Sequence, residues 1–131
     1  MNYIRWQGIC RELFLFEHVP ELVRDFSHGL ALVTTRVSCA YHQELAAFDE
    51  VVVRMRAAAI TPSRLTLAFA YFRVADGAEE LVADGEQEIA CLRRAGSRLE
   101  PIPLPQALRD AVERYNGSTG APESARTERP R

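Results

Sequence analysis

The stretch MNYIRWQGICRELFLFEH, residues 1–18, decides how the rest of the chain is interpreted. It predicts a helix over residues 3–17, because its apolar side chains recur at helical spacing at positions 6, 9, 10, 13, 14 and 16. Two charged residues, Arg11 and Glu12, lie among these apolar positions. Burying a charge is costly unless the charge is paired, so this pair is the first candidate for a special role.

The composition is that of one folded domain. The chain has 131 residues, of which 47% are hydrophobic and 26% are charged, and this balance predicts a real core. The net charge of −2 gives no general reason to expect binding to nucleic acid. All 16 cationic residues are arginine, which a GC-rich genome explains. Recognition of phosphate or carboxylate would need arginines gathered on one surface, which spacing alone does not show.

The cysteines indicate a reducing compartment. Cys10, Cys39 and Cys91 are widely spaced, and no CxxC pair or nearby histidine indicates a metal site. Their odd number predicts free thiols in the cytoplasm, and we expect neither a metal nor another cofactor. No apolar run approaches the ~18 residues needed to cross a bilayer, so we expect no membrane association.

After the first helix the pattern changes period. A short helical turn is predicted over residues 20–27, ending at Gly29. Alternation and β-branched residues then predict four strands, at 30–42, 51–60, 64–74 and 80–94. One face of the third strand is expected to form the core under the helix, namely Leu65, Leu67, Phe69 and Tyr71. Gly85, inside the fourth strand, suggests a β-bulge.

Helical spacing returns near the end of the chain. A short helix is predicted within residues 99–115 from the apolar positions Leu104, Leu108, Ala111, Val112 and Tyr115. Residues 116–131 have almost no apolar side chains and are predicted to be a disordered tail. The order of elements predicts an α+β fold, in which one long helix packs on one face of an antiparallel sheet, because that helix alone is apolar enough to cover the sheet.

Two stretches resemble a known family. RWQGICREL, residues 5–13, and AFDEVVVRMR, residues 47–56, resemble the enediyne-biosynthesis thioesterases of polyketide synthases. These enzymes have the hotdog fold of the 4-hydroxybenzoyl-CoA thioesterase-like superfamily, and the resemblance implies that here too an antiparallel sheet is wrapped around one long helix. The resemblance runs to about residue 98 and implies a hotdog thioesterase domain over residues 1–98. The second motif alone indicates only a hotdog fold, so the first carries the family assignment.

The resemblance implies a function and a set of site residues. Family members are homo-oligomers, dimers or tetramers, that hydrolyse a polyene or β-ketoacyl thioester on the acyl carrier domain of a polyketide synthase. Their chemistry uses an asparagine in a loop before the long helix, together with an arginine on that helix. The arginine falls on Arg11. A tyrosine near the start of the helix falls on Tyr3, and a threonine on the next strand falls on Thr34, both implied to contact substrate.

The resemblance also implies a further N-terminal segment. In family members a first strand, the asparagine and a loop precede the position of Met1, so we expect the first strand of the fold to be missing from this sequence. We expect that the start codon is assigned too far downstream, rather than that the product is truncated. A truncated product would favour an inactive hotdog module that binds acyl chains or only assembles.

The side chains themselves restrict the chemistry. Arg11 cannot be a general base, because its guanidinium stays protonated and only donates hydrogen bonds. Glu12 is the natural base candidate by chemistry, although it lies about 100° of helix rotation from Arg11. Gln7 does share the face of Arg11, at i and i+4. Cys10 is interpreted as a core residue rather than a nucleophile. A general acyl-CoA thioesterase remains an alternative, because the sequence does not distinguish it from a thioesterase that acts on a carrier-protein-bound substrate.

Overall fold

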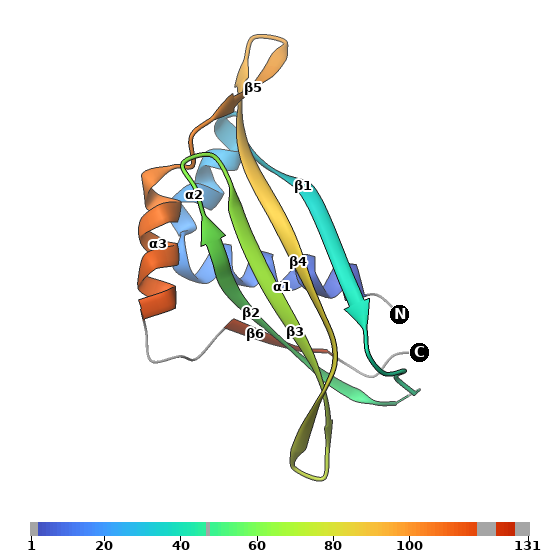
Figure 1. Ribbon diagram of the computed structural model, residues 1–131. Coiled ribbons are helices and arrows are strands. Elements are labelled where there is room, and N and C mark those ends of the chain that lie inside the picture. Colours follow the sequence, from blue (N-terminus) through green and yellow to red (C-terminus); the bar gives the residue numbers. More distant parts are fainter. Residues whose placement is uncertain (1–2, 47, 118–122, 128–131) are drawn as a thin grey trace.

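The computed structural model describes residues 3–46, 48–117 and 123–127, and Figure 1 shows one sheet with a long helix across one of its faces. The helices are α1 (Tyr3–His18), α2 (Pro20–Asp25), the 3₁₀ turn η1 (Phe26–His28) and α3 (Gln106–Gly117). The strands are β1 (Leu30–Tyr41), β2 (Glu50–Ile60), β3 (Leu65–Ala75), β4 (Ala78–Ala95), β5 (Arg98–Ile102) and β6 (Glu123–Thr127).

The sheet is antiparallel and open. Its strand order is β1-β4-β3-β2-β6, and β5 pairs with the end of β4. The predicted α+β class and the four predicted strands are confirmed. The predicted core face of β3 is also confirmed, because Leu65, Leu67, Phe69 and Tyr71 are all buried. From β2 the buried side chains Val51, Val53 and Met55 join them, whereas Arg54 and Arg56 lie on the other face.

Helix α1 buries a narrower stripe than its apolar pattern suggests. The buried side chains are Tyr3, Gln7, Cys10, Phe14 and Leu15. Three apolar positions of the predicted helical pattern lie outside the core, because Ile9, Leu13 and Phe16 are 37%, 43% and 65% exposed. They follow one another at i, i+4 and i+7 and so form an apolar stripe on the side of α1 away from the sheet.

Two strands were not predicted. The segment assigned to a C-terminal helical region contains β5, which extends the β4 hairpin through Gly96, a glycine with φ of 67°. The predicted disordered tail contains β6, which pairs with β2 from Val51 to Met55. The tail prediction is therefore wrong for residues 123–127, and residues 118–122 and 128–131 lie outside the described residues.

Gly85 is not a bulge. It pairs in regular register with Cys39 and with Phe69, whereas the extra residues lie at Thr35 in β1, Ala58 in β2 and Val82 in β4. The reason for glycine is space. An added Cβ would lie 2.3 Å from the carbonyl oxygen of Ser38 and 2.5 Å from Nε2 of Gln7. A glycine therefore lets α1 approach the sheet at this point.

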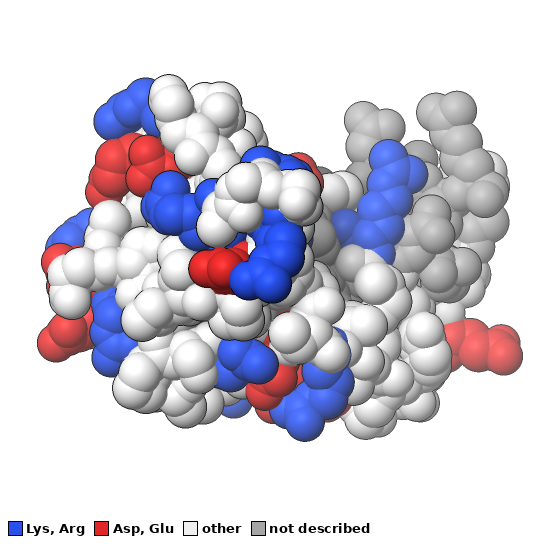
Figure 2. All heavy atoms as spheres, turned by 90° about the horizontal axis from the view of Figure 1, so that it is seen from above, with Lys and Arg blue, Asp and Glu red and all other residues white. Residues whose placement is uncertain are grey.

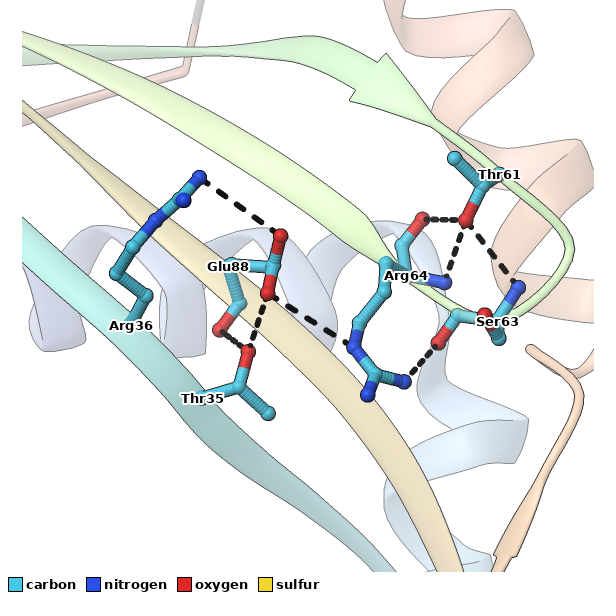
Figure 3. Close-up of polar contacts among 6 residues, drawn as sticks. All are labelled: Thr35, Arg36, Thr61, Ser63, Arg64 and Glu88. Carbon is cyan, nitrogen blue, oxygen red and sulfur yellow. Dashed lines mark hydrogen bonds and ion pairs between the residues drawn. The ribbon is translucent and has the colours of Figure 1, made fainter.

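The bulge at Thr35 matters more for the site. Thr34 pairs with the inward-facing Ile89, while Arg36 pairs with the outward-facing Glu88. Residues two apart would normally share a face, so the extra residue reverses the alternation. Figure 3 shows the outer side of this arrangement, where Thr35 donates a 2.8 Å hydrogen bond to Glu88. Arg36 and Arg64 lie 3.7 and 3.8 Å from the same carboxylate.

Helix α3 closes the end of the core beside α2 (Figure 1). Three apolar positions of its predicted helical pattern are buried, namely Leu108, Ala111 and Val112. The hydroxyl of Tyr115 donates to the carbonyl of Met55 at 2.7 Å, and Asn116 Nδ2 donates to the carbonyl of Ala57 at 3.0 Å. These bonds tie α3 to the bulged end of β2.

Surface charge is mixed on the face seen in Figure 2, where acidic and basic side chains lie next to one another among uncharged ones. None of the helices in the described part of the chain is long and apolar enough to cross a membrane.

The glycines of α1 and β4 give opposite stability predictions. Gly85→Ala should lower the free energy of unfolding by at least about 3 kcal/mol, the upper end of the usual cost of overpacking. The reason is that the Cβ of the new alanine would lie against a backbone oxygen, which cannot move aside easily. Gly8→Ala should raise the free energy of unfolding by about 1 kcal/mol, because alanine is the better helix former and the new Cβ meets nothing within 4 Å. Urea unfolding of both variants measures this. Equal effects would contradict the close approach of Ser38 in β1 and Gln7 in α1 to Gly85.

Candidate active site

Arg11 is the centre of a polar group between α1 and the sheet. Its NH1 donates to Thr34 Oγ1 at 2.9 Å and to Gln87 Oε1 at 3.1 Å. Thr34 is exposed on β1, and Gln87 is buried on β4. The guanidinium therefore lies where the helix–sheet interior opens toward the outer edge of β1. The structure thus brings two of the predicted site residues, Arg11 and Thr34, into direct contact.

The charge of Arg11 is poorly compensated. Burial lowers the pKa of Arg11, and the neighbouring Glu12 opposes that effect. Arginine remains a cation all the same. Both side chains that accept its hydrogen bonds are neutral, and no carboxylate in the described ranges forms an ion pair with it. A half-buried cation without a bonded anion favours negative charge arriving at the same place.

Two buried glutamines flank the arginine. Apart from tyrosines and cysteines, Gln7 and Gln87 are the only buried polar side chains of the described residues, 0% and 4% exposed. Gln7 Nε2 donates to the carbonyl of Ser38 at 3.1 Å. Sequence reasoning placed Gln7 on the face of Arg11 but gave it no role, and it missed Gln87. The available signal for Gln87 was the alternation of β4, which places it on the same face as Gly85.

Tyr3 lies in a separate aromatic cluster. Its ring packs edge-on against Tyr41 and Tyr71, with centroids 4.9 and 4.8 Å apart, and Trp6 lies 5.4 Å away. The buried hydroxyl of Tyr71 donates to the carbonyl of Tyr3 at 2.7 Å, and burial raises the pKa of both tyrosines. Eight residues, or about 12 Å of helix rise, separate Tyr3 from Arg11.

A hollow of about 640 Å³ opens beside this cluster. It is lined by Tyr3, Tyr41, His42, Gln43, Glu44 and Leu45. The structure therefore places Tyr3 at a cavity rather than in the hydrogen-bond group of Arg11. Aromatic rings at a cavity of this size suit an extended apolar or conjugated ligand.

The other candidates lie elsewhere on α1. Glu12 is exposed and makes no hydrogen bond to Thr34 or Gln87. Cys10 is fully buried, with its thiol 3.7 Å from the carbonyl of Val53, as expected of a core cysteine. Within the described residues, no group of three or more His, Cys, Asp or Glu side chains is placed to hold a metal ion.

Comparison with known proteins places this geometry in a family. The pattern of the thioesterase-like superfamily matches residues 1–112. A search of curated proteins gives no match. Among solved structures, one of the dynemicin thioesterase, reported to show induced-fit and allosteric effects upon polyene binding, has 46% identity and a TM-score of 0.80. The alignment covers 86% of this chain and 80% of that one.

Two further structures agree. A thioesterase-superfamily protein from Jannaschia sp. CCS1 has 28% identity and a TM-score of 0.73, with 91% of this chain and 72% of that one covered. A 4-hydroxybenzoyl-CoA thioesterase variant in complex with 4-hydroxybenzoyl-CoA has 14% identity and a TM-score of 0.74, covering 85% and 82%, and supports the fold alone. The chain belongs to the thioesterase-like superfamily, has the hotdog fold and is a thioester hydrolase.

Proposed function

We propose that this protein hydrolyses a polyene or β-ketoacyl thioester held on the acyl carrier domain of a polyketide synthase, as in enediyne biosynthesis. The observation that carries the proposal is the poorly compensated guanidinium of Arg11, held by Thr34 and Gln87 at the open side of the helix–sheet interface. The 46% identity to the dynemicin thioesterase supports the substrate class.

The reaction needs a water molecule and a site that stabilises an oxyanion. Water attacks the thioester carbonyl carbon, and the carbonyl oxygen takes up negative charge in the tetrahedral intermediate. The intermediate collapses as the C–S bond breaks, and the sulfur leaves as a thiol with the proton from the water. Arg11 lowers the barrier because it donates to the oxyanion, and one such donor is worth about 2.7–4 kcal/mol.

The acyl chain would lie toward the aromatic end of α1. In this proposal Tyr3 contacts substrate, because it is a wall of the hollow that Tyr41 and Leu45 also line. A conjugated chain stacks favourably on tyrosine rings. Thr34 acts at the other end, where its hydroxyl orients Arg11. Glu12 is exposed and opposes the lowering of the pKa of Arg11, so we assign it an electrostatic part rather than that of a base.

The function is tested with one β-ketoacyl group presented in two ways, on a phosphopantetheinylated carrier domain and on coenzyme A. We expect faster hydrolysis from the carrier domain, measured by release of the free acid. Arg11→Met should lower kcat/KM by about 10²–10³-fold without unfolding the protein, because the oxyanion loses its donor. A preference for coenzyme A would favour a general acyl-CoA thioesterase. Binding without turnover would favour an inactive acyl-binding module.

Adjacent threonines give a matched pair. Thr34→Val removes the hydroxyl that accepts from Arg11 and should lower kcat/KM by about tenfold, equivalent to about 1.4 kcal/mol of transition-state stabilisation. Thr35→Val makes the same change one residue on, where the hydroxyl bonds Glu88 on the outer face, and should leave kcat/KM unchanged. The same kinetic assay measures both variants. Equal losses would remove Thr34 from the mechanism.

We further propose that the protein acts in the cytoplasm as a homo-oligomer. None of Cys10, Cys39 and Cys91 forms a disulfide, as suits a reducing compartment. Strand β1 has 12 residues and, in the described sheet, pairs only with β4. A long unpaired edge is a template for pairing with another chain. A second copy bound there would also cover the open side of the Arg11 group.

Oligomer formation is tested by sedimentation. The mass should be at least twice the 14.7 kDa of one chain. Val37→Lys, at a 42% exposed position of β1, should shift the protein toward 14.7 kDa, because lysine disfavours edge pairing. Leu81→Lys changes a residue of equal exposure, 43%, on β4 and should leave the mass unchanged. A monomeric parent protein, or equal effects of both lysines, would rule out association through β1.

A further inference from the structure

Gln7 carries an unused acceptor in the middle of α1. The side chain is fully buried, yet its carbonyl oxygen Oε1 has no hydrogen-bond partner in the described part of the chain. A buried acceptor without a partner costs about 1–3 kcal/mol of stability. Most buried polar groups in folded proteins are satisfied, so such an atom indicates a role that the protein alone does not fill.

The orientation of the Gln7 amide follows from its neighbour. Nε2 donates to the carbonyl oxygen of Ser38 at 3.1 Å. Rotating the amide by 180° would place Oε1 against that oxygen, so that two acceptors would face each other. Gly85 provides the room for this contact, because an added Cβ would lie 2.5 Å from Nε2. The fold therefore holds Gln7 in place and leaves Oε1 unpaired.

Arg11 lies one helical turn further along and carries a buried donor without a hydrogen-bond partner in the described ranges. Its NH1 is bonded to Thr34 and Gln87, but its buried Nε has no partner among the described residues. Gln7 and Arg11 are four residues apart and so share a helix face. One unused acceptor and one unused donor on that face match the two needs of thioester hydrolysis, an acceptor for water and a donor for the oxyanion.

We propose that Gln7 Oε1 accepts a hydrogen bond from the water that attacks the thioester, while Arg11 stabilises the oxyanion; this rests on the proposed thioester hydrolysis. An amide oxygen is too weak a base to remove the proton. Gln7 therefore orients the water, and the proton passes to the departing sulfur as the C–S bond breaks. Gln7 is a catalytic residue in this scheme, because it contacts a reacting atom.

The first test is Gln7→Met, which keeps the length of the side chain and removes both polar atoms. With a β-ketoacyl N-acetylcysteamine thioester as the probe, kcat should fall about 10²-fold, since misplacing a reactant costs about that much, while KM stays unchanged. The free energy of unfolding should stay about the same, because the hydrogen bond to Ser38 is lost together with an unsatisfied acceptor. Gln106→Met makes the same change at an exposed position of α3 and should alter neither kcat nor stability.

The second variant, Gln7→Glu, retains an acceptor at the same place. Its kcat should exceed that of Gln7→Met at acidic pH, where the protonated carboxyl donates to Ser38 as Nε2 does and keeps its carbonyl oxygen as an acceptor. It should fall as the pH rises and a carboxylate oxygen comes to face the carbonyl of Ser38, a dependence that the parent glutamine lacks. A structural role would not change the pH profile in this way.

Each outcome decides between the two proposals. Unchanged kcat in Gln7→Met, or a loss of kcat that only follows a loss of folded protein, overturns the role of Gln7. In that case turnover by the parent protein and its loss in Arg11→Met would leave the thioesterase proposal standing. A parent protein without activity on the probe or on the carrier-bound thioester overturns both.

Discussion

The close approach of α1 to β4 at Gly85 is the constraint on which the site depends. Because this position has no Cβ, the amide of Gln7 reaches the carbonyl of Ser38 across the sheet surface. The absent Cβ sets the height of the helix above the strands. One turn later the same height lets Arg11 reach Thr34 and Gln87. A bulkier residue at this point would lift the helix and separate the arginine from both partners.

This arrangement lowers stability locally and relies on the core around it. Two buried glutamines and a half-buried cation lie where apolar side chains would pack better. The large buried side chains on either side, Phe14 toward α3 and Tyr71 toward the start of α1, hold the helix down. Natural proteins retain such strained polar groups where function needs them, and local rules fail mainly at such places.

The sequence predicted the helices and strands better than it predicted which of their faces are covered and which distant segments pair. Alternation in β2 and β3 gave the core face correctly, because a strand has only two faces. Helical spacing did not separate the exposed Ile9, Leu13 and Phe16 from the core of α1, because periodicity shows that a helix side is apolar but not what covers it. The strand β6 depends on pairing with distant β2, which no local pattern reveals. Arg11 and Thr34 came from a resemblance, while Gln87 required the register of β4.

That register explains why the guanidinium keeps its charge available. In β4 the acidic side chains of Asp84, Glu86 and Glu88 face away from α1, while Gly85 and Gln87 face toward it. A slip of one residue would reverse the faces. After such a slip, carboxylates would lie against Arg11 and neutralise its charge. A side chain in place of Gly85 would also fill the space that Gln7 needs. The alternation of acid and non-acid along this strand therefore serves the site as much as the sheet, and neutral glutamine at position 87 holds the arginine without neutralising it.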